Sequence, residues 1–224
     1  MNLRARSVGL ALASLMVALA MPVRAAAATI GILVFDGFLT SDVTAPFEVF
    51  GAASKKAAFS SYKVLLVSAT RNKEVVSEEG LRIVADKTIY DDLKLDVVLA
   101  PSSYAMGRVL KNRDLIDFIR NQSRSASWMA SNCSGAQLLG EAGVLDGKHA
   151  TTWAGGEKQL AAAYPKIKVE VDKNVVIDDK VITSNGGPVS YQAAFELLAR
   201  LSSQKFAGEV AESIQFGRLR GAFK

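Results

Sequence analysis

The residues that could carry out chemistry lie in one short segment, which contains the only cysteine of this 224-residue chain. The apolar run Ser127–Ser131 predicts a strand, and Asn132-Cys133-Ser134-Gly135 leads directly into a helix predicted over 134–142. A strand that turns sharply into a helix projects one side chain at the carboxyl edge of a sheet, which is the arrangement of a nucleophile elbow. The spacing therefore makes Cys133 a candidate nucleophile.

The predicted surroundings of Cys133 favour a reactive thiol. At a helix N-terminus, the helix dipole and the free backbone N–H groups favour the thiolate and could hold a developing oxyanion. Gly135 lets the helix approach the sheet closely. A buried structural cysteine is the alternative interpretation, because cysteine is common in protein cores.

The composition excludes several other kinds of site. One cysteine cannot form an intramolecular disulfide, and one cysteine with one histidine, His149, cannot complete a zinc site. Lys and Arg number 27 against 22 Asp and Glu, with no basic stripe, so nucleic-acid binding is not indicated. We find no glycine-rich phosphate loop and no acidic metal loop, and therefore expect neither a cofactor nor a metal.

Alternating strands and helices must position this segment. Apolar and β-branched runs predict strands over Thr29–Phe35, Tyr62–Ser68, Leu95–Ala100, Ser127–Ser131, Lys168–Val171, Val175–Ile177 and Val181–Thr183, with a hairpin over Val75–Ile89. Helices are predicted over Thr40–Ala53, Met106–Ser123, Ser134–Ala142, Tyr191–Leu201 and Ala207–Phe216. In the first helix we expect Val43, Phe47 and Phe50 to face the core. This alternation predicts an α/β fold with a mostly parallel sheet.

The first 28 residues have a different character. Arg4 and Arg6 precede the apolar run Val8–Met21, and small residues follow at Ala25–Ala28. This pattern is typical of a secretory signal peptide, although an uncleaved anchor is an alternative for a run somewhat short of the roughly 20 residues of a membrane span. We predict a signal peptide over 1–28, a single domain over 29–224, a periplasmic location and no stable membrane association. A lone thiol in an exported protein meets oxidants, which favours a functional Cys133 over a structural one.

Three segments resemble the ThiJ/PfpI superfamily. They are GILVFDGFLTSDVTAPFEVFGAA near the start, SNCSGAQLLGEAGVLDGKHATTW around Cys133, and ITSNGGPVSYQAAFELLARL near the end. The resemblance covers Thr29 to Leu201 and is strongest to the isonitrile hydratase branch and the sensor domains of AraC-type regulators. It implies a flavodoxin-like three-layer sandwich of the class I glutamine amidotransferase type, with a cysteine nucleophile elbow, and a homodimer.

The same resemblance implies roles for individual residues. Cys133 corresponds to the nucleophile, Asp42 to the acidic residue that contacts its sulfur, and Ser134 to the hydroxyl residue after the cysteine. A carboxyl group beside a thiolate is pushed toward protonation and can then donate a proton. The alternative, purely structural interpretations are that Asp42 only complements its helix dipole and that Ser134 is only the first helical residue.

Two further features concern the oxyanion and substrate-binding positions. Ser102 and Ser103 stand where relatives usually carry two glycines, so this loop has lost the freedom of glycine at positive φ. Trp153 stands where many relatives have histidine, and His149 lies roughly 13 Å away along an extended strand, as a solvent-facing residue. These departures speak against a glyoxalase or deglycase, and Ser134 in place of histidine speaks against a protease. A glutamine amidotransferase would need a downstream His-x-Glu pair that the chain lacks.

Two functions from different classes follow. The first is a cysteine-dependent hydratase or hydrolase that adds water to a small carbon–nitrogen substrate. Cys133 would attack carbon, Asp42 would transfer protons, and backbone N–H groups near Ser134 and Ser103 would stabilise the developing charge. The second is a non-catalytic sensor that binds a small molecule or responds to oxidation of Cys133.

The N-terminal pattern generates the first testable prediction. When the full chain is expressed in a Gram-negative host, the mature protein is expected in the periplasm, beginning between Ala26 and Thr29, because the apolar segment is short and ends in small residues. N-terminal sequencing of the periplasmic fraction measures this. A cytosolic pool that retains Met1 would contradict it.

Overall fold

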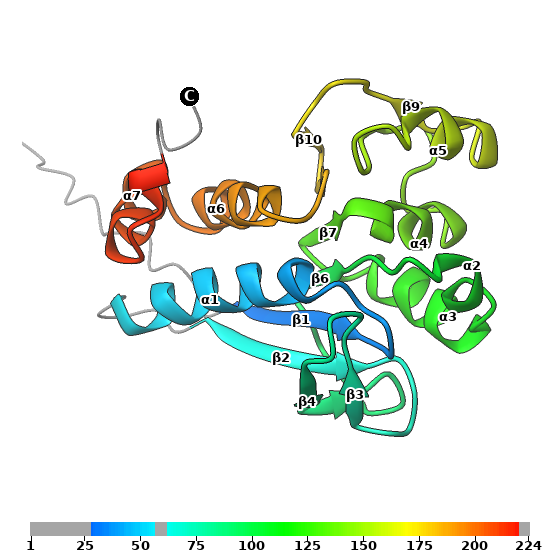
Figure 1. Cartoon of the computed structure of the whole chain (residues 1–224), viewed down its shortest axis with the longest axis horizontal. Coiled ribbons are helices and arrows are strands. Elements are labelled where there is room, and N and C mark those ends of the chain that lie inside the picture. The colour runs from blue at the N-terminus through cyan, green and yellow to red at the C-terminus, as the bar shows by residue number, and fades with distance from the viewer. Residues whose placement is uncertain (1–27, 57–61, 220–224) are drawn as a thin grey trace, which may run out of the picture.

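The computed structural model describes residues 28–56 and 62–219 (Figure 1). The predicted signal peptide lies outside the described residues except for Ala28. Within the described ranges, no helix is both long enough and apolar enough to cross a membrane.

A seven-stranded sheet forms the centre of the molecule, in the strand order β10-β11-β7-β6-β1-β2-β5. Its six parallel strands are β1 (Thr29–Val34), β2 (Lys63–Ser68), β5 (Lys87–Thr88), β6 (Val97–Ala100), β7 (Trp128–Asn132) and β11 (Val181–Ser184), and β10 (Val175–Asp178) pairs antiparallel with β11. Two small pairs lie outside it: β3 (Glu74–Val76) with β4 (Arg82–Val84), and β8 (His149–Ala150) with β9 (Lys168–Val169).

Helices cover the sheet in two groups. The helices α1 (Thr40–Lys56), α6 (Val189–Leu201) and α7 (Gln204–Ser213) pack together, and α3 (Arg113–Gln122) packs with α4 (Ala136–Glu141). In Figure 1, α1 runs along β1 and β2. The strands β6 and β11 are buried at every position, as strands covered on both faces must be. The predicted α/β, flavodoxin-like sandwich with a mostly parallel sheet is therefore confirmed.

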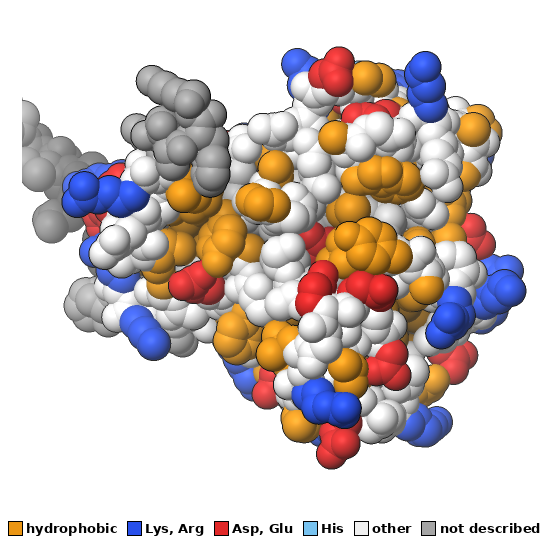
Figure 2. Space-filling view, viewed as in Figure 1, with side chains coloured by type: hydrophobic (Ala, Val, Ile, Leu, Met, Phe, Trp, Pro, Cys, Tyr) orange, Lys and Arg blue, Asp and Glu red, His pale blue; other side chains and the backbone are white. Residues whose placement is uncertain are grey.

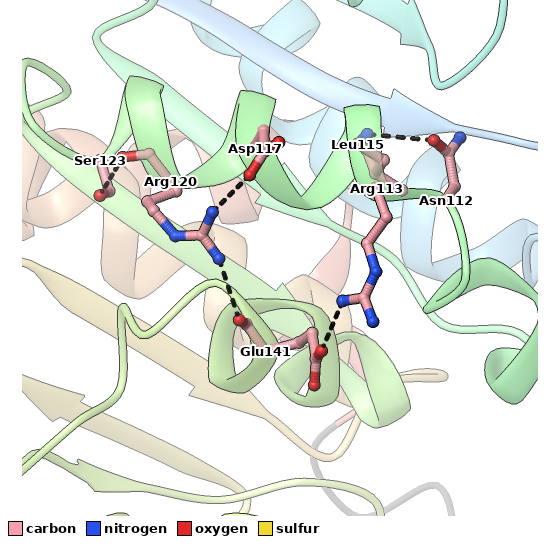
Figure 3. Close-up of polar contacts among 7 residues, drawn as sticks. All are labelled: Asn112, Arg113, Leu115, Asp117, Arg120, Ser123 and Glu141. Atoms are coloured by element: carbon pink, nitrogen blue, oxygen red, sulfur yellow. Dashed lines mark hydrogen bonds and ion pairs between the residues drawn. The ribbon is translucent and has the colours of Figure 1, made fainter.

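The predicted helix over Met106–Ser123 is wrong in one respect, because it is two helices, α2 (Met106–Val109) and α3. The break lies at Asn112, whose side chain accepts a hydrogen bond from the backbone N–H of Leu115 at 3.1 Å (Figure 3). Asparagine is a preferred N-cap residue, so it starts a new helix within a pattern that is otherwise periodic. The sequence patterns did not predict α5 (Glu157–Ala163) or the short strand β8. The strand predicted over Lys168–Val171 is present as β9, but it ends at Val169 and pairs with β8 outside the main sheet.

The expected inward orientation of Phe47 is also wrong. Val43 and Phe50 are buried, but Phe47 is 45% exposed. The buried stripe of α1 runs through Pro46, Val49 and Ala53, which places Phe47 at its edge.

The predicted hairpin over Val75–Ile89 is present in part. Its first part forms β3 and β4, whereas its last part leaves the hairpin and joins the main sheet as β5.

The helix that follows the elbow, α4, is held at its far end by α3 (Figure 3). Arg113 Nη1 lies 3.0 Å from Glu141 Oε1, and Arg120 Nη2 donates to the Glu141 carbonyl at 3.4 Å. Arg120 also pairs with Asp117 on its own helix. Cationic side chains at the carboxyl end of a helix offset its dipole, so these contacts stabilise α4 where it ends.

At its near end, α4 is held by close packing against β6. A Cβ at Gly135 would overlap the backbone carbonyl of Ala100, the last residue of β6. Only glycine therefore allows the elbow to approach β6 as closely as it does, which agrees with the expectation for this residue.

Replacement of Gly135 by alanine tests this packing. Gly135→Ala is expected to lower the free energy of unfolding by about 1–3 kcal/mol, because the added methyl group meets backbone that cannot rotate away. The matched control is Gly51→Ala in the interior of α1, where a Cβ would meet nothing within 4 Å. That change should stabilise the protein by about 0.5–1 kcal/mol. Urea unfolding of both variants gives the comparison, and equal effects would contradict the packing argument.

Candidate functional site

The candidate site forms where four neighbouring parallel strands end. Asp42 lies in the first turn of α1, which follows β1; Ser102 and Ser103 follow β6; and Cys133 follows β7. The glycine pair 186–187 follows β11. The strand order β11-β7-β6-β1 makes these ends adjacent, so the topology gathers residues that are distant in sequence at one edge of the sheet.

Cys133 has the backbone of a nucleophile elbow. Its φ angle is 51°, an uncommon value for a residue with a side chain, and a 3₁₀ turn at Cys133–Gly135 connects β7 to α4. The Cys133 carbonyl accepts a hydrogen bond from Thr152 Oγ1 at 2.9 Å. Asn185 Nδ2 in turn donates to the Thr152 carbonyl at 2.5 Å. The surrounding loops thus hold Cys133 in a strained conformation.

The carboxyl group of Asp42 is completely buried and accepts four hydrogen bonds. Oδ1 accepts from the Gly187 N–H at 2.8 Å and from Ser190 Oγ at 3.1 Å. Oδ2 accepts from the Ser102 N–H at 3.1 Å and from Ser102 Oγ. Each oxygen therefore receives one backbone N–H and one hydroxyl group, and these donors come from two loops and the start of α6.

The shielded environment of the site raises the pKa of both Asp42 and Cys133. Burial raises the pKa of Asp42, and its four hydrogen bonds oppose this increase without cancelling it. Burial likewise raises the pKa of the Cys133 thiol, and the negative charge of Asp42 raises it further. Hydrogen bonds from the Ser102 side chain and the Ser134 N–H lower the pKa of the thiol by less. The expectation that the helix N-terminus makes Cys133 a ready thiolate is therefore wrong, because burial and like charge outweigh it.

The expected direct hydrogen bond between Asp42 and the sulfur is not among the contacts of the described residues. Both groups nevertheless lie against Gly186, since a Cβ there would meet the Cys133 Cβ and would lie 2.9 Å from Asp42 Oδ1. The Ser102 side chain is hydrogen-bonded to the carboxyl group. Asp42 and Cys133 are thus neighbours, and the negative charge of Asp42 acts on the thiol.

A proline in α1 links Asp42 to the elbow. Pro46 has no N–H, so the carbonyl of Asp42, four residues earlier, has no intrahelical donor. Asn132 Nδ2 supplies one at 2.9 Å from the residue directly before Cys133. Ser184 Oγ donates to Asn132 Oδ1 at 2.6 Å and fixes its orientation. The proline thereby leaves the Asp42 carbonyl free to accept the hydrogen bond that joins α1 to the end of β7.

Ser134 and Ser103 bond to each other rather than to Asp42. The Ser134 hydroxyl accepts from the Ser103 N–H at 3.3 Å and donates to the Ser103 carbonyl at 3.2 Å. It therefore sets the position of the 101–103 loop against the elbow. Neither Ser102 nor Ser103 is among the described residues with positive φ, so the loop accommodates serine without the glycine conformation.

A cavity of about 390 Å³ opens over Cys133. Its lining is neutral and partly apolar and consists of Leu39, Ser103, Tyr104, Met106, Gly107, Cys133, Ser134, Gln137, Trp153 and Gln159. Asp42 and Ser102 are buried behind this surface. On the face drawn in Figure 2, hydrophobic side chains gather near the position that β6 and β7 occupy in Figure 1, with acidic side chains beside them. The cavity suits a small uncharged molecule.

His149 and the other possible metal ligands do not belong to this site. His149 is exposed, as expected, and its Nδ1 lies 2.6 Å from Glu170 Oε1. Within the part of the chain that the structure describes, no three His, Cys, Asp or Glu side chains form a group that could hold a metal ion. The sequence patterns gave no role to Asn132, Thr152 or Ser190. Asn132 directly precedes Cys133 in the elbow, and Ser190 directly precedes the helix predicted over Tyr191–Leu201, whereas Thr152 had no such signal.

Comparisons with known proteins give a consistent result. The model described as the DJ-1/PfpI family matches residues 28–200. The chain is 31% identical to isonitrile hydratase of Pseudomonas putida, over 77% of this chain and 71% of the hydratase. It is 26% identical to the HTH-type transcriptional regulator CdhR of Pseudomonas aeruginosa, over 65% of this chain and 43% of the regulator. A solved ThiJ/PfpI family protein from Pseudomonas syringae superposes with a TM-score of 0.76 at 25% identity, covering 85% of this chain and 75% of that one.

The buried Asp42 generates a prediction about pH. Burial holds its folded-state pKa above that of an ordinary aspartate, so at pH values between the unfolded and folded pKa the folded protein holds a proton that the unfolded chain releases. Stability from this group is therefore present below the unfolded pKa and lost as pH rises through the folded pKa. Asp42→Asn removes this titration. It also sets an amide N–H against a backbone N–H, which costs about 1–3 kcal/mol.

The measurement is the free energy of unfolding in urea between pH 4 and 8. The stability advantage of the wild type over Asp42→Asn should shrink as pH rises. Asp91→Asn is the control, because hydrogen bonds from Thr88 lower the pKa of Asp91, so the advantage of the wild type over this variant should not shrink as pH rises. An advantage over Asp42→Asn that grows with pH would contradict the assignment.

Proposed function

This chain belongs to the DJ-1/PfpI family, and from that membership we propose that it is a cysteine-dependent enzyme that adds water to a small, uncharged carbon–nitrogen substrate. An isonitrile is the substrate we favour. The observation that carries the proposal is the elbow itself: Cys133 is held at a φ of 51° on the wall of a neutral cavity, with a buried carboxyl group behind it. The identity to isonitrile hydratase supports the same choice of chemistry.

The proposed reaction converts an isonitrile and water into an N-substituted formamide. In the first step the Cys133 sulfur bonds to the isonitrile carbon, and the thiol proton ends on that carbon, which gives a thioimidate. In the second step water adds to the same carbon, the carbon–sulfur bond breaks, one proton goes to nitrogen and the other returns to sulfur. Atoms and electrons balance without an oxidant, a reductant or a metal.

Asp42 would hold the proton while it is away from sulfur. A base that works near neutral pH needs a pKa above that of an ordinary carboxyl group, and burial raises the pKa of Asp42 in this direction. The Ser134 N–H lowers the pKa of the thiol and would stabilise negative charge on the sulfur. The Ser103 N–H is directed at the Ser134 hydroxyl, so we assign it to positioning the loop.

The neutral lining supports an uncharged substrate. The polar side chains that line the cavity are hydroxyl and amide groups, together with the thiol and the indole of Trp153. Two carboxylates lie nearby: Glu79 accepts from the Thr40 N–H at 3.0 Å, and a Cβ at Gly37 would lie 3.2 Å from Glu78 Oε2. Negative charge beside a shielded cavity disfavours anionic molecules.

A sensor is the second candidate function. The raised pKa of the Cys133 thiol favours it, because a thiol that stays protonated is a poor nucleophile. The match to the regulator CdhR supports it as well, although this chain covers less than half of that protein. In this case the cavity would bind a small molecule without turnover.

The N-terminal pattern and the family resemblance support two further parts of the proposal. We propose that the mature protein works in the periplasm and that it does so as a homodimer.

Activity assays on purified protein distinguish the two functions. We expect the wild type to hydrate small neutral isonitriles, with formamide detected by mass spectrometry. Cys133→Ala should lose at least about a hundredfold in kcat/KM, since the nucleophile is gone. An isonitrile carrying a carboxylate should be a poorer substrate by about tenfold or more, given the neutral lining and the nearby acidic side chains. The panel of test compounds also includes oxoaldehydes and small esters.

Two outcomes would overturn the enzyme. One is no turnover of any compound in the panel by protein whose fold is intact by circular dichroism. The other is equal turnover by the wild type and Cys133→Ala. Saturable binding of a neutral ligand without turnover would instead support the sensor.

A further inference from the structure

Trp153 begins a short turn that is bonded to the elbow. The Gly156 N–H donates to the Trp153 carbonyl at 2.9 Å, which closes a four-residue turn. Gly155 occupies the third position of this turn at a φ of 91°, which residues with a side chain rarely adopt. Thr152, directly before the turn, donates from its hydroxyl group to the Cys133 carbonyl at 2.9 Å. The backbone of Trp153 is therefore fixed relative to the nucleophile.

The indole of Trp153 lies directly against Gly156. A Cβ at residue 156 would lie 2.0 Å from Trp153 Cε2 and 2.3 Å from both Cδ2 and Cζ2. These three atoms belong to one six-membered ring, and their similar distances mean that the ring lies across the glycine instead of touching it with a single atom. Since no side chain fits between the ring and the backbone, only glycine at 156 allows the indole to take this position.

The indole separates Gly156 from the cavity over Cys133. Trp153 lines the cavity, whereas Gly156 is buried and does not line it. Trp153 itself is only half-buried, so it does more than complete the hydrophobic core. Because the backbone of Gly156 lies on one side of the ring, the open space on its other side is the cavity. An indole that is displaced from the glycine therefore moves into the cavity and narrows it.

Trp153 is the rigid aromatic part of the cavity wall. Tyr104 also lines the cavity, but it is 79% exposed and can turn into solvent. Met106 is unbranched, and a methionine side chain adapts its shape to what it contacts. Trp153 has neither freedom, because the glycine backbone supports its ring and the turn fixes its main chain. A bulky molecule that approaches Cys133 can displace the other two side chains but not the indole.

We propose that Trp153 is a specificity-determining residue that limits the size of the substituent on the molecule that reacts with Cys133. For the proposed hydratase, an isonitrile on a methyl group is then preferred over one on a benzyl group. The choice of isonitriles rests on the proposed function, whereas the size limit is a property of the cavity and the thiol. Gly156 acts through Trp153, because it holds the indole in place.

The test compares alkylation of Cys133 by two neutral reagents with the same reactive group, iodoacetamide and the bulkier N-benzyl iodoacetamide. Cys133 is the only cysteine of the chain, so mass spectrometry of the intact protein follows its modification directly. The measured quantity is the ratio of the two rates at a fixed pH, which cancels any change in the pKa of the thiol. Trp153→Ala should raise the relative rate of the bulky reagent by about tenfold, because space opens in the cavity. Trp153→Phe keeps an aromatic ring and should retain most of the selectivity.

A double-mutant cycle tests the contact between the indole and Gly156. Gly156→Ala should lower the relative rate of the bulky reagent by about fivefold, since the displaced indole narrows the cavity. In the double variant Trp153→Ala with Gly156→Ala, the ratio should equal that of Trp153→Ala, because no ring is left to displace. Gly107→Ala is the matched control, since Gly107 also lines the cavity but a Cβ there would meet nothing within 4 Å. Its effect should be the same with and without the indole.

The size limit and the proposed function can fail separately, because alkylation needs no substrate. The predicted ratios without turnover of any isonitrile would overturn only the enzyme. With turnover, Trp153→Ala should raise kcat/KM for benzyl isonitrile relative to methyl isonitrile by about tenfold, chiefly through KM.

Two results would overturn the inference. A ratio of alkylation rates that is unchanged in Trp153→Ala would contradict the size limit. Equal effects of Gly156→Ala with and without the indole would contradict the role of Gly156. A loosened fold would instead raise the rates of both reagents together, including that of iodoacetamide. In that case Trp153→Leu, which keeps an apolar side chain at this position, replaces Trp153→Ala in the comparison.

Discussion

The arrangement of the site depends on the burial of one carboxyl group, that of Asp42. A carboxyl group without water is costly unless its oxygens accept hydrogen bonds, and here donors arrive from the loop after β6, the loop after β11 and the start of α6. Each donor constrains the segment that carries it. The need for hydrogen-bond donors to the Asp42 carboxyl group therefore fixes the loops that border Cys133. Burial raises the pKa of each of the two groups, and the charge of Asp42 raises that of the thiol further.

Two backbone features attach this carboxyl group to the elbow. Pro46 leaves the Asp42 carbonyl without an intrahelical donor, and Asn132 fills that place from the end of β7. Gly135 lets the turn press against the carbonyl of Ala100. Pro46, which lacks an N–H, and Gly135, which lacks a side chain, thus have the same effect on the packing of the site. They bring α1, β6 and β7 together at the edge where Cys133 emerges with a positive φ.

The pairing of a buried thiol with a buried carboxyl group has a chemical consequence. Each group makes ionisation of the other less favourable, so the pair tends to keep one proton and to move it rather than release it. Such a pair suits a reaction in which a proton leaves sulfur and later returns. It also suits a thiol that responds slowly to oxidants. The neutral cavity above Cys133 is compatible with both the hydratase and the sensor. The two functions differ in whether the molecule bound in the cavity reacts with the thiol.

The sequence by itself determined the α/β class, the run of parallel strands and the elbow at Cys133, because hydrophobic periodicity and turn residues are local signals. The role of Asp42 was implied only by the family resemblance, since no local pattern connects residues 91 positions apart. It did not determine that α3 begins anew at Asn112 or that Phe47 faces outward, since capping and the position of the buried stripe depend on neighbouring elements. Only the tertiary structure decided which groups donate hydrogen bonds to the Asp42 carboxyl group, and that this group and Cys133 both lie against Gly186. Hydrogen bonds between residues 60 or more positions apart, and the desolvation that shifts a pKa, exist only when the fold has brought those residues together and excluded water.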